Sequence, residues 1–226
     1  MAQRDKLLIS SGVVGVLVLV LALRHAVPVT SAFVLDKALF AHRVPYMAAV
    51  LGWALFSVYW DAAAKGAAPA KSSESGASRA VHVFATNAAL LLVLAPIRGL
   101  GRYLPVSALI MTAGLAVEAL GLLLAIWARR HLGRNWSGEI TIKVDHQLIR
   151  SGPYRLLRHP IYTGILAMYV GGAVVTGEWL AITGLILIAL AYWRKIRMEE
   201  ANLKVAFGAD YDAYRRQTWV LLPWVL

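Results

Sequence analysis

The sequence predicts an all-α integral membrane protein, a polytopic helix bundle of about six transmembrane helices with no Rossmann domain. Hydrophobic residues make up 59% of the 226 residues and charged residues only 15%. The mean hydropathy is +0.63, higher than that of an ordinary soluble domain. The apolar residues lie in blocks of about the 20 residues that cross a bilayer. No G-x-G-x-x-G stretch occurs, since Gly99-Leu100-Gly101 lacks the third glycine.

These apolar blocks define the expected spans in chain order. The first follows Arg4 and Lys6, and no small-x-small cleavage site comes after it, so we expect a retained anchor rather than a signal peptide. The connection 28–43 is itself fairly apolar and suits a helix lying in the membrane interface, which leaves five spans as the alternative to six. The six expected spans are 7–27, 44–60, 81–97, 104–127, 161–176 and 179–193.

The basic residues predict the orientation. The net charge is +11, and 18 of the 23 Lys and Arg residues fall on one side of the membrane if the N-terminus is cytosolic. Cytosolic loops carry such an excess, so both termini are expected in the cytosol. A nucleic-acid-binding domain gathers its charges on one solvated face, whereas these charges lie between apolar blocks. We therefore expect membrane lipids and a lipophilic substrate as partners, and no nucleic acid.

A polar segment divides the chain. Residues 62–78, AAAKGAAPAKSSESGAS, are small or polar, which predicts a flexible cytosolic linker over 61–80. It separates two N-terminal transmembrane helices in 1–60 from a core in 81–226. The last helical pattern continues past Trp193 to a C-cap at Gly208. At about 1.5 Å per residue this helix is roughly 43 Å long, so its end projects beyond a hydrocarbon core of about 30 Å.

The densest polar segment is 146–164, HQLIRSGPYRLLRHPIYTG. Pro160 suits the first turn of a helix, and free amide groups there, together with Arg158 and His159, favour an anion site. Gly164 and Gly171 leave one side of this helix without bulk. Such a stripe permits either a closely packed neighbouring helix or a flat ligand.

A second polar group lies on the projecting helix and just after it. Glu199 and Glu200 are followed by Tyr211, Tyr214 and Arg215, which have the spacing of one helix face. A charged helix end above a membrane is also typical of a solvated rim.

The two segments together suggest a family. RHPIYTG at 158–164, EEANLKVAFGADYDAYRRQT at 199–218 and LLP near the end resemble the isoprenylcysteine carboxyl methyltransferase family and its phospholipid-methyltransferase relatives, over about 136–223. The resemblance implies an S-adenosylmethionine-dependent methyltransferase of the membrane, with a cytosol-facing pocket formed by the last spans and the C-terminal helix. By resemblance, the cofactor-binding residues are His159, Tyr162, Gly164, Glu199 or Glu200, Tyr211 and Tyr214.

The chemistry of S-adenosylmethionine fits these residue types. Its carboxylate needs a cation or free amides, which Arg158 and the helix start supply, and its hydroxyls and amine need acidic acceptors such as Glu199 or Glu200. Methyl transfer is an in-line displacement that requires alignment and exclusion of water. We expect no metal, because the histidines lack a ligand spacing such as H-E-x-x-H.

The identity of the methyl acceptor stays open. A prenylcysteine-like carboxylate, the family default, needs only a cation such as Arg197 or Arg215 to hold it. A phospholipid amine arrives protonated and needs a glutamate such as Glu200 to take its proton. Gln217-Thr218-Trp219 departs from the Val-Pro-Thr-Gly-type stretch usual in eukaryotic members. Less favoured alternatives are a sterol-type membrane reductase and a non-catalytic membrane protein.

Two further residues have alternative interpretations. Glu118 lies inside the fourth expected span, where a carboxyl group suggests a function, unless it is protonated or bonded to Asn87 or Thr112. Trp136 either closes the pocket or belongs to the interfacial tryptophan belt.

Overall fold

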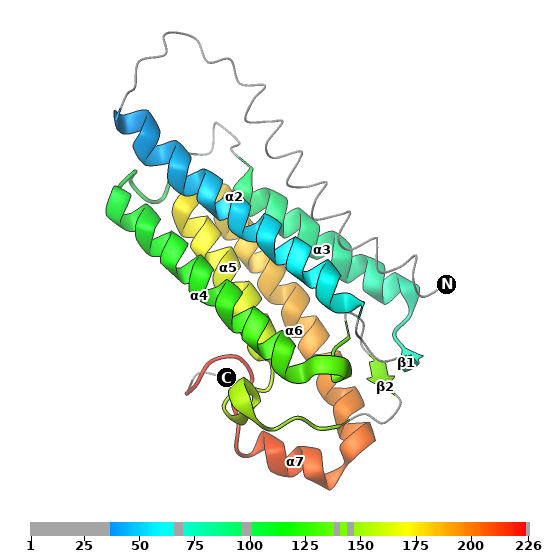
Figure 1. Cartoon of the computed structure of the whole chain (residues 1–226). Helices are drawn as coiled ribbons and strands as arrows, with labels where there is room; N and C mark the ends of the chain where they lie inside the picture. Colours follow the sequence, from blue (N-terminus) through cyan, green and yellow to red (C-terminus); the bar gives the residue numbers. More distant parts are fainter. Residues whose placement is uncertain (1–36, 66–69, 96–100, 138–140, 144–146, 225–226) are drawn as a thin grey trace.

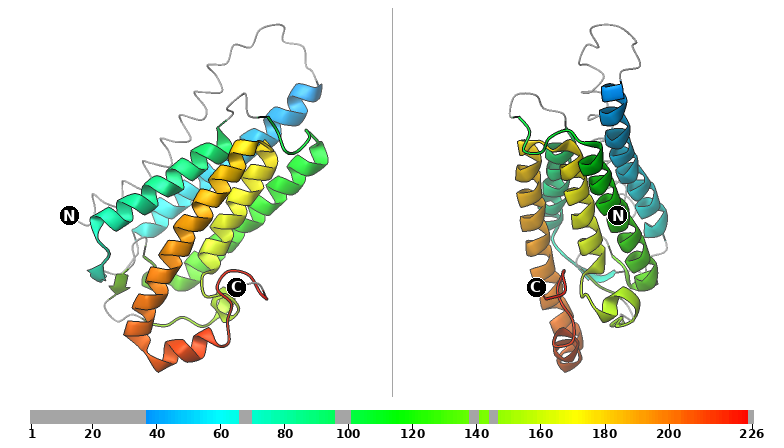
Figure 2. Two further views of the ribbon diagram at one scale, coloured as in Figure 1. Left: turned by 180° about the vertical axis from the view of Figure 1, so that it is seen from behind. Right: turned by 90° about the vertical axis from the view of Figure 1, so that its left-hand side faces the viewer.

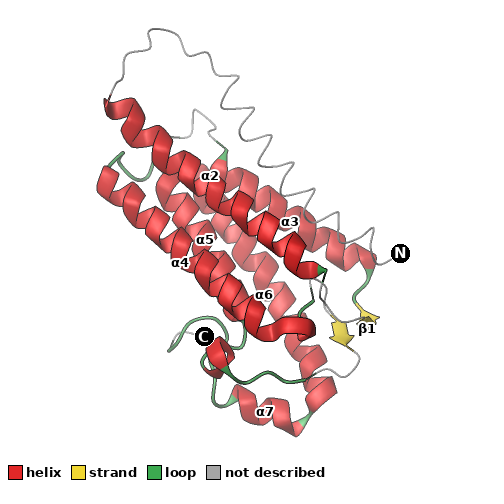
Figure 3. Cartoon of the chain, viewed as in Figure 1, coloured by secondary structure: helices red, strands yellow, loops and turns green. Residues whose placement is uncertain are grey.

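The computed structural model describes residues 37–65, 70–95, 101–137, 141–143 and 147–224. In this part of the chain five long helices form a bundle, and the only strands are two short paired ones (Figure 3). The all-α class is therefore confirmed, and the expected span 7–27 lies outside the described residues. The long helices are α2 (Lys37–Ala64), α3 (Gly76–Leu94), α4 (Ala108–Leu132), α5 (Pro160–Thr176) and α6 (Trp179–Phe207).

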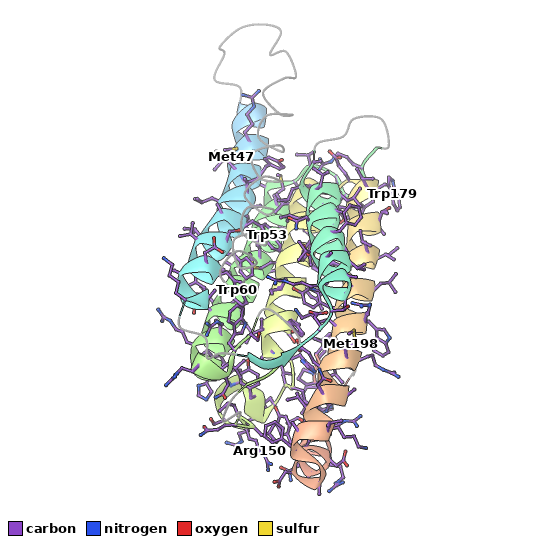
Figure 4. The ribbon with its side chains drawn as sticks, turned by 90° about the vertical axis from the view of Figure 1, so that its right-hand side faces the viewer. Met47, Trp53, Trp60, Arg150, Trp179 and Met198 are labelled. Carbon is purple, nitrogen blue, oxygen red and sulfur yellow. The ribbon has the colours of Figure 1, made fainter. Side chains whose placement is uncertain are left out.

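The bundle has one polar end, at which α4 ends and α5 begins. The end of α2, the start of α3 and the end of α6 lie at this same end (Figures 1 and 2). Figure 4 shows Arg150 at the polar end and Trp179 at the opposite one. The polar end also holds β1 (Ala70–Ser73), β2 (Thr141–Lys143), the 3-10 helices η1 (Gly133–Asn135) and η2 (Gly152–Arg155), and α7 (Ala209–Arg215). The described segments that the charge pattern assigned to one side of the membrane thus gather at one end.

The helices have the length and composition of membrane spans. Among the described residues, four segments are long and apolar enough to cross a bilayer: Arg43–Ala64, Gly76–Leu94, Ala108–Asn135 and Trp179–Phe207. Helix α5 is apolar but has only 17 residues. Large apolar side chains such as Leu109, Leu120 and Leu190 point outward and are 62–80% exposed, as lipid-facing side chains are. The chain is a multi-pass integral membrane protein.

Helices α4 and α5 touch through their backbones. A Cβ atom on Gly121 would lie 2.5 Å from the carbonyl oxygen of Gly164, and a Cβ on Gly164 would lie 2.5 Å from that of Gly121. Gly114 and Gly171 form a second such contact one heptad away. Of the two interpretations of the small-residue stripe, helix packing is correct. The expectation that Gly164 binds the cofactor was wrong, because α4 occupies the space beside it.

The segment between α2 and α3 is more ordered than the linker expected over 61–80. Helix α2 continues to Ala64, and α3 starts at Gly76, where the Ser75 hydroxyl accepts a hydrogen bond from the Ser78 amide at 3.2 Å. Strand β1 pairs antiparallel with β2. The cap is a local bond and the ladder joins segments far apart in the sequence; the small, polar composition revealed neither.

Glu118 is buried between helices, and its side chain is only 3% exposed. A Cβ on Gly52 of α2 would lie 2.5 Å from its Oε1 atom, so α2 also packs closely here. Among the described residues neither carboxyl oxygen has a hydrogen-bond partner, which removes Asn87 and Thr112 as the expected partners. Asn87 instead donates to the Val83 carbonyl at 2.8 Å.

The backbone contact predicts which glycines the fold requires. Gly121→Ala and Gly164→Ala should each lower the free energy of unfolding by about 1–3 kcal/mol, since the new methyl group forces α4 and α5 apart. Gly76→Ala is the control, because a methyl group added at Gly76 would meet nothing within 4 Å. Thermal unfolding in detergent measures the effect, and equal melting temperatures for all three variants would contradict it.

Candidate functional site

A cavity opens at the polar end of the bundle. It is partly open to solvent, and its empty space of about 880 Å³ includes the open mouth. One wall is the end of α4 and the loop that follows, a second is the segment from 147 to the first turn of α5, and a third is one face of α6. The lining residues are Leu132, Asn135, Trp136, Ser137, Gln147, Leu148, Ile149, Tyr154, Arg158, His159, Ile161, Tyr162, Glu199, Asn202, Leu203 and Tyr214.

The start of α5 positions two of these side chains. Pro160 is the first helical residue and His159 the N-cap, as the sequence predicted. The His159 ring is 6% exposed and stacks nearly parallel on Tyr162, with ring centroids 5.4 Å apart. Its Nε2 atom is buried, and no hydrogen-bond partner for it lies within the described segments.

Glu199 and Glu200 have separate surroundings, since adjacent residues point about 100° apart around a helix. Glu199 lies on the cavity wall, where its carboxylate accepts a hydrogen bond from the Tyr162 hydroxyl and lies 3.7 Å from His159 Nδ1. Glu200 lies behind the wall and meets basic groups: Arg158 Nε at 2.7 Å, His159 Nε2 at 3.4 Å and Arg215 Nε at 3.7 Å. Glu199 is therefore the carboxylate that faces the cavity.

The cations keep Glu200 ionised. Both glutamates lie on the part of α6 beyond Trp193, where the apolar pattern has ended. Burial by itself would raise the pKa of the Glu200 carboxyl, but the polar contacts and charges of His159 and Arg158 outweigh burial and lower the pKa to about 2.

Arg158 divides its donors between this ion pair and the backbone. Its Nε binds Glu200, and its Nη1 donates to the carbonyls of Arg215, at 3.1 Å, and of Thr218. The Nη2 group is the part that remains for a ligand anion.

The two expected tyrosines have different positions. Tyr214 lines the cavity and its hydroxyl donates to the Tyr154 carbonyl at 2.7 Å. Burial raises the pKa of Tyr214 to about 12, so the hydroxyl stays protonated and remains a donor. Tyr211 is fully buried and is not on the wall. The helical spacing was right, but the first turn of α7 directs Tyr211 into the core, so placing it in the pocket was wrong.

The two arginines that were expected to bind the acceptor also differ in their positions. Arg215 lies near the site, because its Nε atom is 3.7 Å from the Glu200 carboxylate, and 43% of its side chain is exposed. Arg197 is exposed and its guanidinium lies 5.9 Å from the ring centroid of Trp193. Because Arg197 is two residues before Glu199, it points roughly 200° away around α6. Its expected place at the site was wrong.

Trp136 belongs to the cavity wall, which decides between its two interpretations. It is 7% exposed, the Arg129 guanidinium lies 4.2 Å from its ring centroid, and Trp60 of α2 meets it edge-on at 5.6 Å. The sequence reasoning missed Asn202 and Leu203, although they follow Glu199 at the i+3 and i+4 positions of the same helix face. The wall residues Asn135 and Gln147 carried no motif that would have identified them.

The comparisons with known proteins agree with this geometry. The family model described as phospholipid methyltransferase matches residues 109–210, from the second residue of α4 to α7. This range contains all the residues that line the cavity except Tyr214.

Three individual proteins resemble the chain. A probable protein-S-isoprenylcysteine O-methyltransferase of Oryza sativa subsp. indica is 32% identical over 115 residues, which cover 50% of this chain and 60% of that protein. Methanethiol S-methyltransferase of Mycobacterium tuberculosis is 37% identical over 75 residues, 31% of this chain and 28% of that one. The solved structure of a eukaryotic isoprenylcysteine carboxyl methyltransferase has a TM-score of 0.47 and 18% identity, with 96% of each chain covered.

The chain thus matches only part of the length of its curated relatives. The range matched by the family model holds the first polar motif and the second as far as residue 210. Residues 109–210 are therefore similar to the phospholipid methyltransferase family, and the chain resembles protein-S-isoprenylcysteine O-methyltransferases.

Proposed function

We propose that this protein is an S-adenosylmethionine-dependent methyltransferase that modifies a lipophilic acceptor within the membrane. The observation that carries the proposal is the meeting of two motifs about 40 residues apart in one cavity. Tyr162 and Arg158 of the first motif bind Glu199 and Glu200 of the second. The names of the relatives support the same reaction class.

The residues of the cavity fit the cofactor. The Glu199 carboxylate on the cavity wall, with the His159 ring beside it, suits its amine and ribose hydroxyls. The Nη2 group of Arg158 suits its carboxylate. Trp136, Ile161 and Leu203 provide apolar surface for its flat base. The bound cofactor would supply a methyl group on a positively charged sulfur, and that charge is lost as the methyl leaves.

The protein's own residues perform binding, orientation and exclusion of water. The hydrogen bond from Tyr162 fixes the Glu199 carboxylate on the wall, while Trp136 and the α4 end close the opposite side. A fixed carboxylate in a site shielded from water interacts more strongly with positive charge than it would in solution. Alignment is then the main contribution to the rate. We further propose that the polar end faces the cytosol, as the excess of basic residues there indicates.

The geometry favours a carboxylate acceptor over an amine. An ammonium group needs a base, and Glu200, with a pKa of about 2, takes a proton poorly. Of the two glutamates that could act as this base, only Glu199 remains. A carboxylate needs a cation, and Arg215, which contacts Glu200 behind the cavity wall, lies closer to the site than Arg197 does. We therefore propose O-methylation of a prenylcysteine-like carboxylate, with N-methylation of a phospholipid as the alternative.

A nicotinamide nucleotide fits the cavity less well. Its phosphates require several cations, and Arg158 is the only Arg or Lys among the described lining residues. The Nε and Nη1 groups of Arg158 are already bonded within the protein. This observation argues against the sterol-type reductase.

Cofactor binding tests the site directly. His159→Ala and Glu199→Gln should each weaken binding of S-adenosylmethionine and its demethylated product roughly ten- to hundredfold, since a hydrogen bond to a charged group is worth about 1.5–3 kcal/mol. Calorimetric titration of detergent-purified protein measures this. Lys204→Ala is the control, because Lys204 lies on α6 outside the cavity and pairs with Asp212 at 3.5 Å. Unchanged affinity in both site variants would refute the assignment.

The lowered pKa of Glu200 predicts how stability depends on pH. A carboxylate whose pKa is lower in the folded than in the unfolded protein stabilises the fold above its unfolded pKa of about 4.3. That contribution is lost as the pH falls toward 2. Wild type should therefore melt higher than Glu200→Gln by a constant margin from pH 8 to about pH 5, and the margin should shrink below pH 4. A margin that grows on acidification would contradict the ion-pair assignment.

The acceptor class can be tested through the arginines. If the acceptor is a carboxylate, Arg215→Lys should lower turnover of a farnesylcysteine derivative, because lysine lacks the fork that matches two oxygens. Cofactor affinity should stay nearly constant, and Arg197→Lys should behave as wild type. Methylation is measured with the farnesylcysteine derivative and with a phosphatidylethanolamine between pH 6 and 9. Preference for the lipid amine, with a rate that rises steeply with pH, would favour the alternative instead.

A further inference from the structure

The chain after α7 turns back toward the bundle and pairs with the segment that carries the site. The Arg158 amide donates to the Trp219 carbonyl at 2.8 Å and the His159 amide to the Val220 carbonyl at 3.2 Å. In return, the Trp219 amide donates to the Leu156 carbonyl at 3.0 Å. These bonds form a short parallel ladder between Leu157 and Trp219.

Side chains add to this backbone pairing. The Thr163 hydroxyl, one turn into α5, donates to the Leu221 carbonyl at 2.8 Å, and the Arg158 guanidinium donates to the Thr218 carbonyl. The Thr218 hydroxyl binds back to the Tyr214 carbonyl at 2.8 Å. An amide without a partner is costly when it is buried. The conformation of the Arg158–His159 segment therefore depends on the returning tail.

The outer face of the tail is apolar and exposed. Leu222 is 50% exposed and Trp224 is 86% exposed, while Leu156, next to the ladder, is 55% exposed. Figures 1 and 2 show the tail beside the polar-end start of α5. Arg155, Arg215 and Arg216, which are close in the chain to Leu156 and to the tail, are also exposed.

This combination is suited to a lipid surface. Tryptophan prefers the boundary between acyl chains and headgroups, and arginines near a membrane are attracted to anionic lipids. Because the helices of this multi-pass protein have the composition of membrane spans, a lipid surface lies near their ends, and it suits this exposed apolar face as a partner.

We propose that residues 217–224 form a strap that holds the Arg158–His159 segment in its binding geometry, and that Leu222 and Trp224 seat this strap on the surface of the bilayer. Only the effect on cofactor affinity rests on the proposed methyltransferase function. The strap and its contact with lipid stand independently of that function.

Hydrogen exchange tests the strap without any cofactor. In nanodiscs of phosphatidylcholine and phosphatidylglycerol, the amides of Arg158, His159 and Trp219 should exchange slowly in the wild type. In the double variant Leu222→Ser/Trp224→Ser these amides should exchange at least about tenfold faster, because the strap no longer contacts the bilayer through apolar side chains. Val205→Ser is the control, since Val205 is an 82% exposed apolar residue on α6 outside the strap. Equal protection in the double variant and the wild type would overturn the lipid seat, and rapid exchange in the wild type would overturn the strap.

A second variant tests whether the strap acts on the site. Thr163→Val removes the bond to Leu221 without changing the size of the side chain, and Thr163 does not line the cavity. Affinity for the demethylated cofactor should fall about two- to tenfold, the effect of one neutral hydrogen bond, with no change in melting temperature relative to Thr176→Val. Thr176 bonds only to carbonyls of its own helix. Unchanged affinity of Thr163→Val for the demethylated cofactor would overturn the effect of the strap on the site. A wild type that does not bind this cofactor would overturn the proposed function. The strap itself would then be tested by the exchange experiment alone.

Discussion

The backbone contact between α4 and α5 is the constraint on which the site depends. Lipid offers no hydrophobic force between helices, so membrane helices associate through close packing, and glycine permits the closest. Gly121 and Gly164 bring the two backbones together near the polar end. The wall residues Leu132 and Trp136 follow from α4, and His159 and Tyr162 come from the start of α5. The glycine contact therefore sets the distance between two walls of the cavity.

The ion pairs around Glu200 then determine which carboxylate faces the cavity. Glu200 pairs with Arg158 and Arg215 behind the wall and also contacts His159. Its neighbour Glu199 lies on the inner surface, where it accepts a hydrogen bond from the Tyr162 hydroxyl. Two identical side chains one residue apart thus have different surroundings, one behind the wall and one on it, because a helix turns by about 100° between them.

Much of this arrangement was predictable from the sequence. The apolar blocks located the described helices, although α2 begins seven residues before the expected span 44–60 and α3 five residues before 81–97. Proline at the first helical position fixed the start of α5. The long-range pairings were not predictable. Which glutamate faces the cavity, why Tyr211 is buried and why Gly164 touches α4 all depend on how helices rotate against each other, which no local pattern encodes. Asn135 and Gln147 reach the site only because the loop after α4 folds back, as the bond from the Gln147 amide to Asn135 shows.

The shortness of α5 has a consequence for depth. Its 17 residues span only about 25 Å at about 1.5 Å each, less than a hydrocarbon layer of about 30 Å, while α6 beside it is far longer. His159, the residue before α5, lines the cavity, so the shortness of α5 favours a cavity close to the acyl-chain boundary, with α6 extending past it. Drawing a lipid out into water costs about 0.8 kcal/mol for each CH₂ group. In the methyltransferase proposed above, a cavity at this depth would let a water-soluble donor reach the lipid, and the acyl or prenyl chain of the acceptor would stay dissolved in the bilayer.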